Sequence, residues 1–253
     1  MTLAITRDVS PRFCECEITH IERTPIDLDV ARIQHHDYVQ ALKRLGCDVV
    51  ELPAEPDLPD SVFVEDTAII LPEVTVITRP GADSRKPETE SIIHALAPLT
   101  RLVHLQAPAT LDGGDVLVLG KNIYVGLSTR SNQKAVDYLN DLLREYGYLV
   151  TGVRLHDCLH LKTAVTRVDE ETLLINKDWV DTHHFMKFNL IEVDPDEPFA
   201  ANCLPVGDTI IFPTAFPKTR ARLEEAGYEV MAVNVSELAK AEGAVTCCSL
   251  ILP

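Results

Sequence analysis

Positive charge is scarce in this sequence of 253 residues. Lysine and arginine together number 23, against 39 aspartates and glutamates, so the formal net charge is −16 at pH 7. Binding to nucleic acid or to an anionic membrane requires a basic surface, and the composition argues against both partners. A cationic small molecule would suit this surface.

Long apolar runs are missing as well. Arg7 and Asp8 interrupt the short apolar stretch near the N-terminus. A signal peptide needs a longer apolar run than this one. No other run approaches the length of a transmembrane helix. We therefore expect no membrane partner and a cytoplasmic location. There the seven cysteines, an odd number, would be mostly reduced.

The motifs of several enzyme classes are absent. The sequence has no phosphate-binding loop, no dinucleotide-binding glycine fingerprint and no Gly-x-Ser-x-Gly elbow. Cysteines and histidines do cluster, but without the spaced pairs of a structural zinc site. The clusters are Cys14 with Cys16, His35 with His36, His183 with His184, and the segment 156–160. We expect no metal and no cofactor, and we expect His35 and His36 to be solvated on a helix.

One arrangement recurs along the chain, namely an amphipathic helix, a stop signal and an apolar strand. The clearest copies have helices at 29–45, 132–146 and 218–226, each followed by a glycine and a strand. Weaker copies have helical segments at 88–97 and 178–188. The stops fall near residues 46, 98, 147, 188 and 227, a regular spacing that indicates five repeats.

The segments between these helices are rich in β-forming residues. They cover 62–71, 115–127, 163–175, 200–212 and 246–252, with hairpin turn signals at 120–122 and 169–171. An ordinary mixed sheet with helices on one face would give a similar pattern. Five comparable units favour closure into a ring, which hides the sheet edges. We expect a single α/β domain over residues 1–253.

Distinctive polar residues stand where each β-rich segment begins. They are Glu65 with Asp66, the segment 112–115, His160 with Lys162, Asn202 with Cys203, and Cys247 with Cys248. In a ring these positions converge on the axis. Convergence would place a cysteine, a histidine and several carboxylates in one pocket, as nucleophilic catalysis on a cationic substrate requires.

Each of these groups also has a purely structural explanation. Asp112-Gly-Gly-Asp115 suits a tight turn, in which glycine permits positive φ. His160 and Cys247 could be core side chains. Glu65 and Asp66 interrupt an apolar strand at 62–69, and buried carboxylates need partners. Their joint placement favours a functional site over four independent coincidences.

Six segments together resemble the dimethylarginine dimethylaminohydrolase family, in the guanidine-modifying or pentein superfamily. In chain order they are Asp60-Ser-Val-Phe-Val-Glu-Asp66, residues 77–85, Leu111-Asp-Gly-Gly-Asp115, Leu159-His-Leu-Lys162, Ala200-Ala-Asn-Cys203 and Thr246-Cys-Cys-Ser249. The resemblance implies a five-bladed α/β-propeller of ββαβ repeats. It also implies hydrolysis of N-methylated arginine to citrulline and an alkylamine through a covalent cysteine thiouronium, without cofactor, and it is compatible with a homodimer.

The resemblance further implies roles for individual residues. Cys247, rather than Cys248, would be the nucleophile, His160 the acid and base, and Asp112 the third catalytic group. The residues expected to bind substrate are Asp60, Glu65 and Asp66 at the guanidinium, Arg85 and Arg130 at the α-carboxylate, and the backbone carbonyls near Ile18 and Ala241 at the α-amine. Two positions depart from the family pattern, because some members have Glu at 112 and a branched aliphatic residue at 241.

Three alternatives stay open at this point. A deiminase of arginine or of another guanidine would use the same groups, although Arg85 and Arg130 argue against agmatine, which has no carboxylate. A non-catalytic pentein would use the ring only as a binding scaffold. A zinc-dependent hydrolase would lose its activity to chelators.

Overall fold

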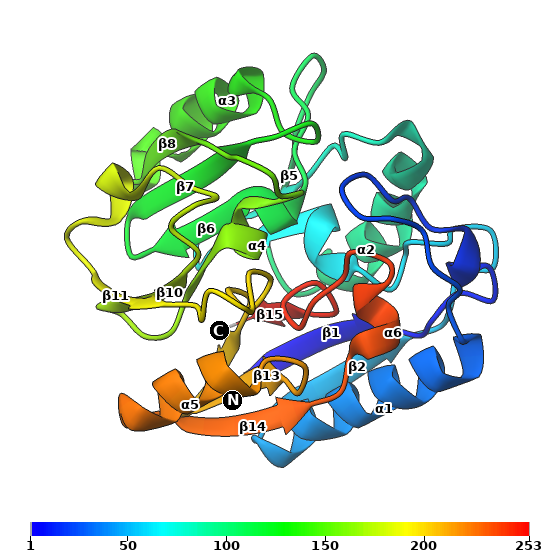
Figure 1. Cartoon of the computed structure of the whole chain (residues 1–253). Coiled ribbons are helices and arrows are strands. Elements are labelled where there is room, and N and C mark those ends of the chain that lie inside the picture. The colour runs from blue at the N-terminus through cyan, green and yellow to red at the C-terminus, as the bar shows by residue number, and fades with distance from the viewer. Residues whose placement is uncertain (1, 253) are drawn as a thin grey trace.

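Five three-stranded sheets surround a common centre in the computed structural model, which describes residues 2–252 (Figure 1). In each sheet two strands are antiparallel, and the third is parallel to the middle one. In chain order the first four sheets are β3 (Ala68–Ile70), β4 (Thr75–Ile77) and β5 (Leu102–His104); β6 (Val116–Leu119), β7 (Asn122–Leu127) and β8 (Leu149–Arg154); β9 (Val165–Arg167), β10 (Thr172–Ile175) and β11 (Asn189–Glu192); and β12 (Leu204–Val206), β13 (Thr209–Pro213) and β14 (Glu229–Val233).

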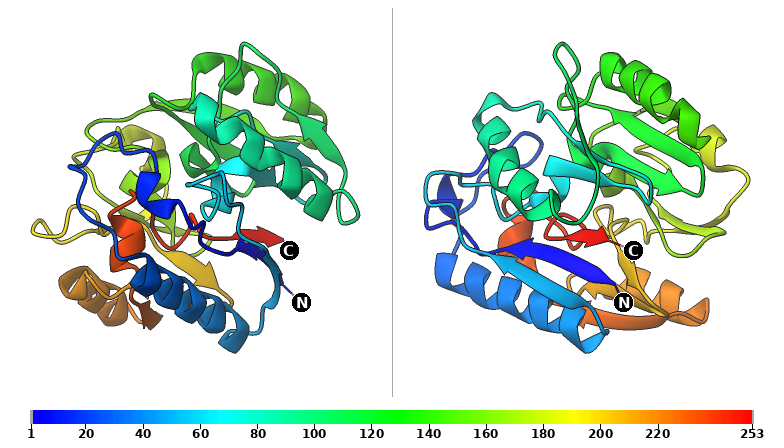
Figure 2. Two further views of the ribbon diagram at one scale, coloured as in Figure 1. Left: turned by 90° about the vertical axis from the view of Figure 1, so that its right-hand side faces the viewer. Right: turned by 180° about the vertical axis from the view of Figure 1, so that it is seen from behind.

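The fifth sheet is built from both ends of the chain. It contains β15 (Leu250–Leu252), β1 (Leu3–Arg7) and β2 (Asp48–Leu52). Leu3 pairs with Leu252 across the antiparallel pair, and the ends of the chain lie side by side (Figure 2). This pairing completes the fifth unit, so the predicted α/β fold of five ββαβ repeats is confirmed.

Helices supply the crossovers that parallel neighbouring strands require. They are α1 (Leu28–Arg44), α2 (Thr89–Leu96), α3 (Gln133–Leu143) and α5 (Pro217–Glu225), and α1, α3 and α5 lie on the outside of the molecule (Figure 1). Gly46, Gly147 and Gly227 follow three of them at positive φ, as expected of stop signals. The third unit has only the short 3-10 helix η6 (Thr182–Phe185). None of the helices in residues 2–252 is long and apolar enough to cross a membrane.

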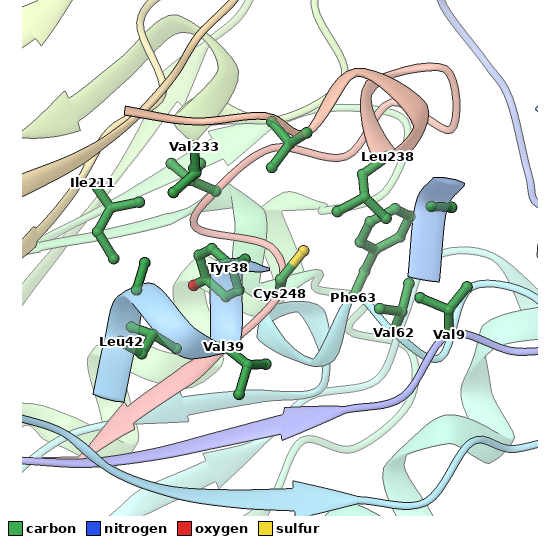
Figure 3. Close-up of a cluster of buried hydrophobic side chains, with 14 of the residues drawn as sticks. Val9, Tyr38, Val39, Leu42, Val62, Phe63, Ile211, Val233, Leu238 and Cys248 are labelled. Carbon is green, nitrogen blue, oxygen red and sulfur yellow. The ribbon is translucent and has the colours of Figure 1, made fainter. Parts of the chain in front are cut away.

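Separate apolar clusters lie between the helices and the sheets, and the largest packs beneath α1 (Figure 3). Tyr38 and Leu42 of α1 are fully buried there with Ile211 and Leu238. The Tyr38 hydroxyl is 2.7 Å from the Ser249 hydroxyl, which satisfies both polar groups inside the apolar cluster. The segment that follows Cys247 is thereby anchored in the core.

The start of the first unit differs from the sequence prediction. Glu65 and Asp66 do not interrupt a strand, because they lie in the 3-10 helix η2 (Val64–Thr67) and β3 begins only at Ala68. Comparable short turns precede the first strands of the second and third units, η4 (Gly113–Asp115) and α4 (Leu161–Ala164). Turns free of strand pairing let these polar side chains point inward.

The prediction that His35 is solvated is wrong, whereas His36 is exposed as expected. His35 is 4% exposed on the inner face of α1, and its Nε2 has no hydrogen-bond partner. Burial lowers the pKa of His35 to about 4, because the charged imidazolium loses its hydration. The two histidines are adjacent on a helix and therefore point in different directions.

Replacing His35 should remove part of the acid sensitivity of the fold. Its pKa is depressed in the folded protein, so the stabilisation present above about pH 6.5 is lost as the pH falls and the unfolded chain takes up the proton first. Between pH 8 and pH 5 this loss amounts to about 2 kcal/mol. We expect His35→Phe to show a correspondingly smaller decrease in unfolding free energy, measured by urea denaturation. His36→Phe is the matched control, and equal pH slopes for both variants would contradict the assignment.

Candidate active site

Five turns, one from each sheet, meet at the centre of the molecule. A cavity of about 280 Å³, which we call the apolar chamber, is lined by one residue from each turn: Glu65, Gly114, His160, Asn202 and Cys247. The rest of its lining includes the apolar side chains of Leu159, Phe199, Phe216, Val235 and Ala239. The polar residues that the repeats placed at equivalent positions therefore do converge.

Hydrogen bonds join these turns into a closed circle. The Glu65 amide donates to the Cys247 carbonyl at 3.1 Å, and the Thr246 amide donates to the Asn202 side chain at 3.1 Å. Asn202 Nδ2 donates in turn to the Lys162 carbonyl at 3.1 Å. Lys162 Nζ reaches the Gly113 carbonyl at 3.1 Å, and the Gly114 amide donates to Asp66 at 2.8 Å. The circle passes through all five units and returns to the first.

His160 lies between two carboxylates. Its Nε2 is 3.2 Å from Asp112 Oδ2, and its Nδ1 is 4.0 Å from Asp66 Oδ1. A Cβ on Gly114 would lie 2.5 Å from His160 Nδ1, so the turn can pass this close only with glycine. The alternative, purely structural explanation of the glycine pair by positive φ does not hold, because neither Gly113 nor Gly114 has positive φ. The space they leave is what matters.

The surrounding charges keep His160 protonated. Burial lowers the pKa of this histidine, but the carboxylates of Asp66, Asp115 and Asp112 outweigh burial and raise it to about 9. Burial also opposes ionisation of Asp66, yet His160 and Arg85 lower the pKa of that carboxyl to about 2. The imidazolium and Asp66 therefore coexist as an ion pair at neutral pH.

Asp115 fixes the segment that carries His160. Its carboxylate accepts the Leu161 amide at 3.0 Å and the hydroxyls of Ser128 and Ser131 at 2.6 Å each. Burial raises the pKa of Asp115 to about 6 in spite of these bonds and of nearby His160. With its partners satisfied, the carboxylate holds α4 in place rather than facing the cavity.

Cys247 and Cys248 have different surroundings. Cys247 is a half-buried residue whose thiol lines the apolar chamber and accepts the Ala244 amide at 3.4 Å. Burial, Glu65 and Asp66 raise its pKa far above the ordinary range, so the thiol is protonated at neutral pH. Cys248 is fully buried near Tyr38 in the cluster beneath α1 (Figure 3). Only Cys247 can meet a ligand in the chamber.

A second cavity adjoins the thiol, and we call it the polar chamber. Its lining includes Asp60, Asp66, Arg85, Arg130, Ala241, Glu242, His160 and Cys247. Its volume is about 20 Å³, room for roughly one water molecule. Of the residues expected to bind substrate, Glu65 instead lines the apolar chamber, and Ile18 lines neither cavity. The remaining expected residues face the polar chamber or contact a residue that does.

The two arginines of the polar chamber differ in their existing contacts. Arg85 is buried, donates to Asp66 at 2.6 Å, and donates through Nε and Nη2 to Glu88 at 2.9–3.2 Å. Its Nη2 also reaches the Phe63 carbonyl at 3.2 Å. Arg130 makes fewer contacts, with Thr19 Oγ1 at 3.1 Å and Asp112 at 3.6 Å. Arg130 thus retains more donors for a ligand.

One segment, residues 16–27, borders both chambers, with Glu17 at the polar chamber and His20 and Ile21 at the apolar chamber. A residue that the sequence analysis did not identify holds it. Glu242 accepts the backbone amides of Thr19, His20 and Ile21 at 2.8, 2.7 and 3.1 Å. The Glu17 amide donates to the Asp60 carboxylate at 3.1 Å. Because the polar chamber is so small, an amino acid can enter it only if this segment, which we call the covering segment, moves. No sequence motif identifies Glu242, because its partners are backbone amides of residues distant in sequence, and backbone amides leave no trace in the amino-acid sequence.

Glu88 is a second functional candidate that the sequence analysis missed. It is 2% exposed and pairs with Arg85 from three residues away, a spacing typical of surface ion pairs on a helix. Burial raises the pKa of Glu88 to about 7 although Arg85 opposes the shift. The helical spacing could have suggested the pair, but only the fold shows that it is buried.

Two groups within residues 2–252 bring three metal-ligating atoms within 4.8 Å of one another. One is Asp66, Asp112 and His160, where Arg85 and Arg130 already oppose the negative charge. The other is the largely exposed group of Asp181, His183 and His184, in which His183 Nδ1 is 2.6 Å from Asp181. Neither group includes the thiol.

Comparisons with known proteins agree with this geometry. The sequence model of the family described as N,N dimethylarginine dimethylhydrolase, eukaryotic, matches residues 21–252. The chain belongs to the dimethylarginine dimethylaminohydrolase family. Among its relatives, the N(G),N(G)-dimethylarginine dimethylaminohydrolase of Streptomyces coelicolor is 38% identical over 251 residues, covering 98% of this chain and 96% of that protein. The resemblance inferred from six short segments is thereby confirmed.

Solved structures of dimethylarginine dimethylaminohydrolases have the same fold. The enzyme of Pseudomonas aeruginosa, in a cysteine-to-serine variant with citrulline, superposes with a TM-score of 0.94 at 33% identity, covering 98% of each chain. An adduct of a histidine-to-glycine variant with S-methyl-L-thiocitrulline also has a TM-score of 0.94 at 33% identity and full coverage of both chains. A cysteine and a histidine are thus the residues replaced in these complexes.

Removing the Glu242 carboxylate should loosen the covering segment. We expect Glu242→Ala to raise the hydrogen-exchange rates of the amides of residues 19–21 at least tenfold, because each loses its acceptor. The measurement is hydrogen exchange with mass spectrometry on peptides spanning this segment. Glu22→Ala, an exposed change in the same segment, is the control. Unchanged exchange in Glu242→Ala would show that other contacts hold the segment.

Proposed function

We propose that this chain hydrolyses N-methylated arginine to citrulline and an alkylamine, with Cys247 as nucleophile. The observation that supports this most directly is the position of the Cys247 thiol, at the boundary between a chamber rich in carboxylates and arginines and an apolar one. A guanidinium with an α-amino acid at one end and methyl groups at the other matches both environments. Membership of the family supports the same reaction.

The reaction proceeds in two stages at the guanidine carbon. The cationic guanidinium beside Cys247 favours loss of the thiol proton to solvent. The resulting thiolate attacks the guanidine carbon, and the bond to the methylated nitrogen breaks as that nitrogen takes a proton from His160. A covalent thiouronium remains and the amine leaves. Neutral His160 then removes a proton from water, whose oxygen attacks the same carbon. The C–S bond breaks to restore the thiolate, the second proton of that water passes to solvent, and neutral citrulline is released.

The carboxylates are proposed to hold the guanidinium. Asp66 and Asp112 lie on opposite sides of His160, while Asp60 and Glu65 add negative charge at the edges of the site. Carboxylates complement the planar donors of a guanidinium, and their charge favours a cation over a neutral ureido product. Product release would therefore be easier than substrate release.

The amino-acid end would lie in the polar chamber. We propose that Arg130 binds the α-carboxylate directly and that Arg85 adds its charge while it holds Asp66. The carbonyls of Ile18 and Ala241 would accept the α-amine. Ile18 belongs to the covering segment, so closure of that segment would complete the site only around a ligand.

We also propose a cytoplasmic location and a homodimer. All seven cysteines are free, as in a reducing compartment. Val30 and Ile33 are exposed on the outer face of α1, with Ile33 at 61%, and such apolar groups are candidates for burial against a second copy.

Substitution of the two adjacent cysteines separates their roles. We expect Cys247→Ser to reduce citrulline formation from dimethylarginine at least a thousandfold, because the hydroxyl is a far weaker nucleophile at this site. Cys248→Ala should keep most of the activity and lose only stability, since Cys248 is a core side chain. Activity is measured as citrulline formed over time. Full activity in Cys247→Ser would rule out the proposed mechanism.

The resting thiol should react slowly with alkylating agents. Burial and the nearby Glu65 and Asp66 raise the Cys247 pKa, so the reactive thiolate is rare at neutral pH and becomes commoner as the pH rises. In a Cys14→Ser background, which removes the exposed cysteine, we expect iodoacetamide to label Cys247 more slowly at pH 7 than it labels a short cysteine peptide. The rate should increase up to pH 10. Faster labelling than the peptide at pH 7 would reveal a resting thiolate.

A further inference from the structure

The apolar chamber is far larger than methyl groups require. Its volume is about 280 Å³, whereas the polar chamber measures about 20 Å³. Both chambers share Leu159, His160, Glu242, Gly243 and Cys247 in their linings, so the two cavities adjoin where the thiol lies. A substrate carbon held at Cys247 therefore has access to both, and most of the free space lies on the apolar side.

The apolar wall of this chamber is fixed by aromatic packing. Phe199 contacts Trp179 edge to face, with ring centroids 4.9 Å apart, and Phe216 packs similarly against Phe212 at 6.4 Å. Phe199 is nevertheless 45% exposed. Covering this exposed phenyl ring with an apolar group lowers the free energy, because water is released from both apolar surfaces.

The direction of the leaving nitrogen follows from the proposed chemistry. That nitrogen must receive a proton from His160, so it lies beside the imidazole during bond cleavage. Its substituents do not turn into the polar chamber, because charged groups line that chamber and the amino-acid end of the substrate occupies it. They must point into the other cavity that His160 lines, the apolar chamber.

We propose that the apolar chamber binds the alkyl substituent of the guanidine, and that arginines with an N-alkyl chain longer than methyl are substrates. This inference rests on the proposed hydrolysis. The bond changes are those of the methylated substrate, with a longer alkylamine as the leaving group. Each additional methylene that becomes buried should improve binding up to about fourfold.

The test compares Nω-n-butyl-L-arginine with Nω-methyl-L-arginine. We expect kcat/KM for the butyl compound to equal or exceed that for the methyl compound, measured as citrulline together with butylamine or methylamine. A lower kcat/KM for the butyl compound, with the methyl compound hydrolysed, would overturn the inference and leave the proposed function intact. Hydrolysis of neither compound would overturn both.

A variant that narrows the chamber locates the alkyl chain. Ala239 lies at the end of α6 (Ser236–Ala239), is exposed and lines the chamber, so Ala239→Leu should reduce the butyl-to-methyl ratio of kcat/KM at least roughly tenfold. Ala97→Leu, at an exposed alanine beyond α2, is the matched control and should keep the ratio. Phe199→Ser removes part of the apolar wall and should also lower the butyl-to-methyl ratio of kcat/KM. It tests the chamber independently of Ala239. An unchanged ratio in both chamber variants would overturn the inference.

Discussion

The closed circle of hydrogen bonds at the axis is the constraint on which the site depends. Each link joins the turn of one unit to the turn of a neighbouring unit, from Glu65 through Thr246, Asn202 and Lys162 to the Gly113–Gly114 turn. These bonds use mainly backbone groups and buried side chains, which are costly to leave unpaired. A displaced turn would therefore break two links, and this couples the position of Cys247 to that of His160, which lies two units away.

Charge balance explains why so many buried carboxylates are tolerated around this circle. Glu65 pairs with Lys162 at 2.7 Å, and Asp66 pairs with Arg85. Asp112 is shared between His160 and Arg130. Isolated buried charges would be very unfavourable, but each of these carboxylates has a cation beside it. Because the positive groups are held by their own partners, an entering guanidinium adds to an already organised site.

The sequence predicts regular elements well and local exceptions poorly. The helix periods and glycine stops located α1, α3 and α5, and the equivalent polar positions identified the residues around the axis. The 3-10 helix at Glu65–Asp66 was missed, because the alternation of apolar residues at 62–69 is that of a strand while the tertiary partners of the two carboxylates decide the turn. Glu242 was missed for the same reason, since its three amide donors lie more than 200 residues away.

The two sides of the site are held with different strength, and this has a consequence for binding. The turns that form the circle of hydrogen bonds belong to five units that support one another. The covering segment is held by Glu242, Arg130 and a few backbone contacts. An α-carboxylate is a stronger partner for Arg130 than the Thr19 hydroxyl that it now contacts, because both groups are charged. Substrate entry can therefore replace the contact between Arg130 and Thr19 without disturbing the circle of hydrogen bonds at the axis. Binding of the amino-acid end is in this way coupled to closure of the covering segment. The alkyl end lies in the apolar chamber.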